Sequence, residues 1–137
     1  MSRPAFNKVA DMLSGICMHA YTGITDNADA AASDIARQVR AYREALYNQG
    51  QNPAAWQLPI IVSECSVNRA PANAGDAFAE YRADVYRRTA SKLSKIDGVK
   101  GVFWYTSHWN PPPNEVANQE SWFGTSLPDR YKRLMGR

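Results

Sequence analysis

A carboxylate stands at the end of an apolar run near the middle of the chain. Glu64 follows Ile61, Val62 and Ser63 in a stretch whose β-branched residues are typical of a buried strand. Glutamate is rarely placed in so apolar a run without a partner or a chemical role, because burying an unpaired charge is costly. Carboxylates act as nucleophiles and as general acids or bases, so Glu64 is the first candidate for a catalytic group. The structural alternative is a salt bridge at the rim of a sheet.

Two other short runs end in residues that commonly bind or orient ligands. His19 and Tyr21 stand two positions apart at the end of the run 16–21, and Trp104 stands near the end of the run 100–106. Each of these residues alone is ordinary packing. In a parallel α/β sheet, however, functional groups gather at the carboxyl ends of the strands. Their coincidence at successive strand ends therefore favours a shared site with Glu64.

The elements that must position these residues are expected to alternate between helix and strand along the chain. Strands are expected over 16–21, 58–66 and 100–106, and helices over 1–13, 26–50, 73–98 and 128–135. In the second helix Ser33 or Asp34 is the expected N-cap and Gly50 the stop. The segment 107–126 is expected to be a long polar and aromatic loop of the kind that often binds ligands.

A helix long enough to cross back separates each pair of expected strands. This arrangement predicts parallel strands joined by right-handed crossovers, so the fold class is α/β. We find no linker or internal repeat, and residues 1–137 are expected to form one unit. Three parallel strands leave sheet edges and a face to be covered. We therefore expect further sheet from a longer parent protein or from identical chains.

Alternation along the second strand predicts which of its side chains share a face. If Glu64 points to the inner face of the sheet, Val62 and Ile60 should do so as well. Cys65 should then point toward the helices. On the first strand, inward-facing His19 and Tyr21 turn Cys17 inward as well.

The two cysteines are therefore expected to point to opposite faces, which argues against a disulfide between Cys17 and Cys65. They form no CxxC pair and no zinc-like spacing with histidine. We expect neither a metal nor a cofactor.

Taken together, three stretches resemble strands six, seven and eight of the clan A glycoside hydrolases, which are retaining enzymes on a (β/α)₈ barrel. The stretches are His-Ala-Tyr at 19–21, Leu-Pro-Ile-Ile-Val-Ser-Glu at 58–64 and Gly-Val-Phe-Trp-Tyr at 101–105. In that clan a His-x-Tyr pair ends strand six, the nucleophilic Glu ends strand seven, and a Trp on strand eight forms the floor of a sugar subsite. The resemblance spans residues 14–134. It implies a partial (β/α)₈ TIM barrel with three parallel βα units, a preceding helix and a C-terminal helix, the C-terminal fragment of a catalytic domain.

The resemblance also implies roles for individual residues in hydrolysis of an oligo- or polysaccharide. Glu64 would be the nucleophile, Tyr21 would donate a hydrogen bond that orients its carboxylate, and His19 would line the same subsite. Trp104 would stack on the face of a sugar ring. Further stacking candidates in the last loop are Trp109, Trp122 and Phe123.

One part of the family's machinery has no counterpart here. A retaining mechanism needs a second carboxyl group roughly 5 to 5.5 Å from the nucleophile. In this clan it follows an Asn at the end of strand four, and this sequence has no such strand. Glu44 and Glu80 fall in expected helices, whereas Glu115 and Glu120 fall in the last loop. The acid/base residue is therefore expected in chain that precedes these units, and the isolated chain is expected to have little or no hydrolase activity.

Three alternatives remain. The chain could be a non-catalytic carbohydrate-binding or structural fragment that self-associates. Cys65 with His108 could act as a thiol nucleophile and base, although Cys65 is expected to face the helices. The basic residues of the last helix could bind nucleic acid, but they lack interleaved aromatic residues and are typical of a solvated helix face.

Composition and charge limit the classes of partner that the chain is expected to bind. The net charge of +3 and the pI of about 9.0 are too mild to indicate nucleic acid. No apolar run approaches the roughly 18 residues of a membrane span, and the first 20 residues do not show the pattern of a signal peptide. We expect no membrane partner and leave the compartment open.

Overall fold

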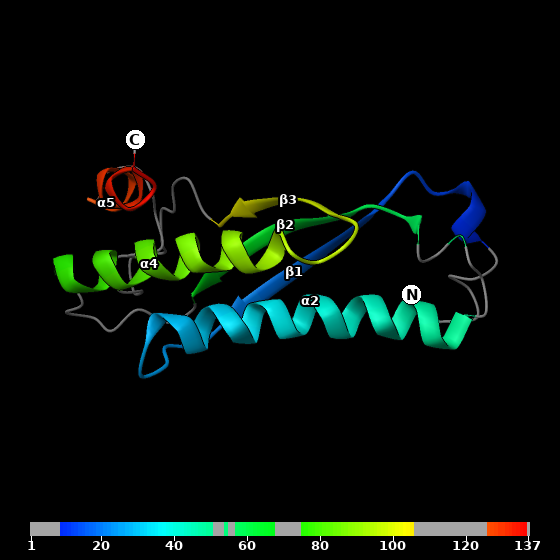
Figure 1. The fold of residues 1–137 in the computed structure, drawn as a ribbon, viewed down its shortest axis with the longest axis horizontal. Coiled ribbons are helices and arrows are strands. Elements are labelled where there is room, and N and C mark those ends of the chain that lie inside the picture. The colour runs from blue at the N-terminus through cyan, green and yellow to red at the C-terminus, as the bar shows by residue number, and fades with distance from the viewer. Residues whose placement is uncertain (1–8, 51–53, 55–56, 68–74, 106–125, 137) are drawn as a thin grey trace, which may run out of the picture.

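The structure is a computed structural model, and it describes residues 9–50, 54, 57–67, 75–105 and 126–136. These residues form a mixed α/β arrangement with one three-stranded parallel sheet (Figure 1). In chain order the elements are η1 (Ala10–Met12), β1 (Ile16–Thr22), α2 (Ala28–Gly50), β2 (Ile60–Val67), α4 (Gly75–Leu93), β3 (Val99–Trp104) and α5 (Leu127–Leu134).

The strands lie in the order β1-β2-β3, and both neighbouring pairs are parallel. The parallel pairing predicted from the crossover helices is confirmed. Helices α2 and α4 contact each other, and they lie along the same side of the sheet (Figure 1). We call this side of the sheet the helix face and the opposite side the open face.

The core lies between the helix face and these two helices. It consists of aliphatic and aromatic side chains that are shielded from solvent because each element turns one stripe toward the others. Its largest fully buried apolar members include Ile35 and Val39 of α2, Val62 and Val67 of β2, and Val85, Tyr86 and Leu93 of α4.

Two predicted helix boundaries are wrong. Helix α2 begins at Ala28, and the side-chain oxygen of Asn27 accepts the Ala30 N–H at 2.8 Å, so Asn27 is the cap in place of Ser33 or Asp34. Helix α4 ends at Leu93, because residues 94–98 form a turn before β3.

The two ends of the chain are less fully described. Of the helix expected over 1–13, the structure describes residues 9–13, which contain the short turn η1. The C-terminal helix is confirmed as α5, within one residue of the predicted bounds, and it packs on α4 (Figure 1). None of the described helices combines the length and apolar character that a transmembrane span requires.

Candidate functional site

Strand β2 contains one extra residue at the position of the candidate nucleophile. Met18 of β1 pairs with Val62, and the next residue, His19, pairs with Glu64, so Ser63 has no partner of its own. The pairing with β3 slips over the same stretch. This is a β-bulge, which changes the alternation of side chains along the strand.

The bulge decides which way Glu64 points. Ile60 and Val62 before it are fully buried on the helix face, and so is Cys65 after it. The Glu64 side chain is 34% exposed and lies with His19 on the open face. The expectation that Glu64 shares a face with Val62 and Ile60 is therefore wrong, whereas the expectation that Cys65 points toward the helices is confirmed.

Three predicted site residues meet toward the carboxyl ends of β1 and β2, where His19 and Glu64 are each followed by three more strand residues. The Tyr21 hydroxyl donates a hydrogen bond to Oε2 of Glu64, and Nδ1 of His19 lies 3.4 Å from the same oxygen. The rings of His19 and Tyr21 are nearly perpendicular, at 84°, with centroids 6.3 Å apart. The His19 side chain is 56% exposed, so its attraction to the carboxylate is screened by solvent. The Tyr21 hydrogen bond is the contact that orients Glu64.

Helix α2 holds the end of β1 in place. The side-chain amide of Gln38 donates to the Tyr21 carbonyl at 2.8 Å and to Asp34 at 2.9 Å. A hydrogen bond from the Arg37 guanidinium holds the pKa of Asp34 below its usual value, so this carboxylate stays ionised as an acceptor for Gln38. The backbone that carries Tyr21 is therefore anchored from the helix beneath it.

Trp104 does not join this cluster. Its ring stacks on Tyr86 of α4, with centroids 4.4 Å apart and an interplanar angle of 9°, and meets the edge of Tyr131 of α5. Trp104 packs on the core with Val102, so it belongs to the helix face. The sequence had grouped Trp104 with Glu64, and the structure separates the two.

Tyr105, which directly follows β3, is the aromatic residue that contacts the cluster. Its ring meets the Tyr21 ring edge-on, at 78° and 6.1 Å between centroids. Its N–H donates to the Cys65 carbonyl at 2.9 Å, which continues the sheet pairing by one residue. Sequence reasoning missed Tyr105, although alternation from a Trp104 that packs against the core would have placed it on the open face.

The remaining predicted residues either lie elsewhere or are not described. Glu80 of α4 pairs with Arg130 of α5, and Glu44 is exposed on α2. The candidates that lie outside the described residues are Trp109, Trp122, Phe123, His108, Glu115 and Glu120.

The two cysteines are both free, Cys17 exposed and Cys65 buried, so the prediction that they do not form a disulfide is confirmed. Burial raises the pKa of the Cys65 thiol to about 12, which keeps the thiol protonated at neutral pH. A protonated, buried thiol is a poor nucleophile, which argues against a catalytic role for Cys65.

A cavity of about 210 Å³ lies at the other end of the sheet, between α2 and the turn before β3, away from Glu64. Its lining residues are Arg40, Arg43, Glu44, Lys95, Ile96 and Asp97. Within the described part of the chain, no three His, Cys, Asp or Glu side chains come together as a set that could hold a metal ion.

Comparisons with protein-family models, with curated proteins and with solved structures found no match. The geometry of Glu64, Tyr21 and His19, and the fold that presents them, therefore carry the functional inference.

Proposed function

We propose that this chain is part of a retaining glycoside hydrolase in which Glu64 is the nucleophile. The observation that carries the proposal is the hydrogen bond from Tyr21 to Glu64, with His19 beside the same oxygen, toward the carboxyl ends of adjacent parallel strands. Functional groups of parallel α/β folds occupy this end of the sheet. The carboxylate is also half-exposed on the open face, where a substrate could reach it.

The proposed chemistry uses the two carboxylate oxygens differently. Oε2 of Glu64 accepts the Tyr21 hydrogen bond, which leaves Oε1 to attack the anomeric carbon of a sugar. The new bond joins Oε1 to that carbon, the glycosidic C–O bond breaks, and a carboxylic acid protonates the departing oxygen. Water then hydrolyses the glycosyl ester and restores the carboxylate. That second carboxyl group would come from chain outside these three βα units.

The arrangement of the elements supports a partial (β/α)₈ barrel. Strands follow one another in sequence order, and both crossover helices lie on one face. Successive βα units of a barrel have this arrangement, whereas a doubly wound sheet reverses its strand order and carries helices on both faces. In the barrel the open face becomes the interior, and Tyr105 takes the place beside the sugar that the sequence had assigned to Trp104.

The proposed partners follow from the same geometry. The substrate is a β-linked carbohydrate, and the open face is completed by further barrel units, or by a second copy when the chain is alone in solution. No cofactor is needed, because both steps are nucleophilic displacements assisted by carboxyl groups.

The test is covalent labelling of the 137-residue chain by 2-deoxy-2-fluoroglycosides that carry a dinitrophenolate leaving group. This leaving group departs without protonation, so labelling does not need the acid/base residue. We expect one sugar on the peptide that contains Glu64 and none in Glu64→Gln. The control Glu44→Gln removes an exposed carboxylate on α2 and should label normally. Tyr21→Phe should slow labelling by about tenfold or more, the effect of losing a hydrogen bond to a charged group.

Two results would count against the proposal. Label on another residue, or label that persists in Glu64→Gln, would exclude Glu64 as the nucleophile. Binding of β-linked oligosaccharides with no label from any fluoroglycoside, with gluco, manno, galacto and xylo forms tried, would favour the non-catalytic carbohydrate-binding alternative.

A further inference from the structure

A buried hydroxyl group joins the two strand ends next to the candidate site. Tyr86 of α4 is fully buried, and its hydroxyl oxygen lies 3.1 Å from Oγ of Ser66 and 3.5 Å from the carbonyl oxygen of Tyr105. Nη2 of Arg82 donates to the same hydroxyl at 2.6 Å. One side chain of the helix layer therefore contacts the ends of both β2 and β3.

The direction of these hydrogen bonds follows from the chemistry of the groups. The Arg82 guanidinium can only donate, so the Tyr86 oxygen accepts from it. Burial raises the pKa of Tyr86, so the hydroxyl keeps its own proton to donate. The Tyr105 carbonyl can only accept, so it is the Tyr86 hydroxyl that donates in that contact. Between the Tyr86 and Ser66 hydroxyls either oxygen can be the donor, and the Ser66 hydroxyl also donates to the Val67 carbonyl at 3.5 Å.

The strand ends that Tyr86 joins carry the candidate site. Ser66 is two residues beyond Glu64, and the Tyr105 ring meets the Tyr21 ring that orients the Glu64 carboxylate. We propose that the Tyr86 hydroxyl is a positioning group for the Tyr21–Glu64 pair, acting through the bridge that it forms between Ser66 and the backbone of Tyr105. This inference rests on the proposed function for its catalytic meaning, but the contacts themselves do not depend on it.

Packing and positioning by Tyr86 can be separated. The Tyr86 ring stacks on Trp104 and lies under the Arg82 guanidinium, whose central carbon is 5.3 Å from the ring centroid. Both contacts involve the ring face and not the hydroxyl. Tyr86→Phe therefore keeps the ring stack and removes the bridge between the strand ends, together with the hydrogen bond that the hydroxyl accepts from Arg82, whereas Ser66→Ala breaks the bridge and leaves the Arg82 hydrogen bond in place.

The experiment compares Tyr86→Phe with Tyr81→Phe in the full chain. Tyr81 is also on α4, and its hydroxyl contacts Thr25 of the β1–α2 connection, not the end of β3. The readouts are the nuclear Overhauser effect between the Tyr21 and Tyr105 rings and the ¹³Cζ chemical shift of Tyr21. We expect Tyr86→Phe to weaken the first and move the second, and to slow fluoroglycoside labelling of Glu64 by about fivefold, the loss of one ordinary hydrogen bond. Tyr81→Phe should leave all three unchanged.

A Tyr86→Phe protein with the wild-type ring contact and chemical shift would overturn the inference. Should Tyr86→Phe not fold, Ser66→Ala removes the bridge from the β2 side and decides the question with the same readouts. The two proposals can fail separately. NMR changes without labelling of the wild type would reject the hydrolase proposal, whereas labelling of Glu64 with unchanged NMR signals would reject positioning by Tyr86.

Discussion

Glu64 and Cys65 are consecutive residues in opposite environments. The carboxylate is half-exposed on the open face with a hydroxyl donor, whereas the thiol is buried in the core. Exchanging the two environments would bury an uncompensated charge, which proteins avoid because desolvation is costly. The bulge at Ser63 therefore lets one strand carry a polar group to the open face and return at once to core packing.

The buried thiol predicts a loss of stability at alkaline pH. Burial raises the pKa of Cys65 from 9.0 to about 12, so between these values the unfolded chain ionises while the folded chain stays protonated. The contribution of Cys65 is complete below pH 9 and is lost as the pH rises toward 12. At pH 10 the loss is about 1.4 kcal/mol, since one pH unit corresponds to that free energy. Urea unfolding of wild type and Cys65→Ala at pH 8 and pH 10 measures it.

We expect the stability difference between the two proteins to change by that amount in favour of Cys65→Ala at pH 10. Cys17→Ala is the control, because it removes an exposed thiol in place of a buried one. Equal pH dependence in wild type and Cys65→Ala would show that the thiol is not buried as the structure places it. Comparing variants removes the contribution of alkaline groups that lie away from residue 65.

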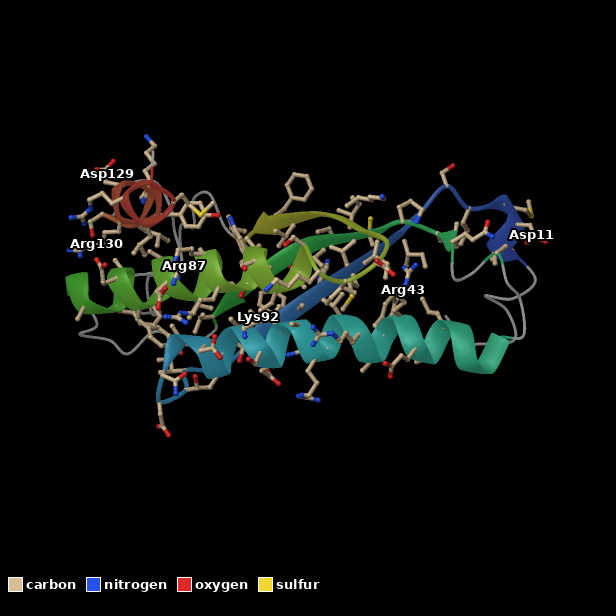
Figure 2. All side chains as sticks on the ribbon, viewed as in Figure 1. Asp11, Arg43, Arg87, Lys92, Asp129 and Arg130 are labelled. Atoms are coloured by element: carbon tan, nitrogen blue, oxygen red, sulfur yellow. The ribbon has the colours of Figure 1, made fainter. Side chains whose placement is uncertain are left out.

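A side chain of α2 attaches this helix to the sheet near the turn between α4 and β3. Arg43 reaches from α2 toward the sheet (Figure 2), is buried, and donates to the Leu58 carbonyl at 3.2 Å just before β2. Its guanidinium also lies against Gly98, the residue before β3, where an added Cβ would be 2.5 Å from Nη1. One side chain thus contacts the entries of two strands.

Gly98→Ala should destabilise the fold. Gly98 has φ +82°, which is costly for a residue with a Cβ, and that Cβ would also displace the Arg43 guanidinium. We expect a loss of about 1 to 3 kcal/mol in the free energy of unfolding, measured by urea titration. Gly23→Ala is the matched control, because no atom lies within 4 Å of its added Cβ. Similar free energies for the two variants would contradict this view of the turn.

The order and direction of the strands could be predicted from sequence. The face of the sheet to which each side chain near the strand ends points could not. Buried apolar residues of β2 step from Ile60 to Val62 and then, three positions later, from Cys65 to Val67. That break in the spacing of two was the visible signal of the bulge. Uniform alternation carried Glu64 to the wrong side of Val62, because a bulge depends on pairing with neighbouring strands and not on local periodicity.

The end of the third strand could not be predicted either, because side-chain packing decides which of its residues faces the cluster. Trp104 and Tyr105 are adjacent aromatic residues, and either could face the cluster on composition alone. The stack of Trp104 on Tyr86 places Trp104 on the helix face and leaves Tyr105 beside Tyr21. Only the tertiary contact with α4 distinguishes the two.

Helices α2 and α4 are joined by ion pairs as well as by the buried core. Arg88 and Lys92 of α4 lie 3.4 Å and 3.1 Å from Asp29 at the start of α2. Figure 2 shows Lys92 on the part of α4 that runs beside α2. Exposed ion pairs of this kind add little free energy, so the buried core supplies most of the attachment. The helix face is therefore well covered by the described helices.

The open face has no comparable cover among the described elements. Phe103 alternates with the core residues Val102 and Trp104 and is 62% exposed, and Cys17 of β1 is exposed as well. Parallel sheets are normally covered on both faces, because their side chains are apolar on both sides. A chain alone in solution is therefore expected to bury this face against a second copy.

Sedimentation of the wild type and Phe103→Lys over a range of concentrations tests this expectation. The wild type should associate, and the lysine variant should raise the dissociation constant by about tenfold or more, because it places a charge where an apolar ring is buried. Met135→Lys is the control, since it makes the same change at an exposed apolar residue just after α5. A wild type that stays monomeric at every concentration would show that the open face needs no second copy, and equal effects of the two substitutions would place the contact elsewhere.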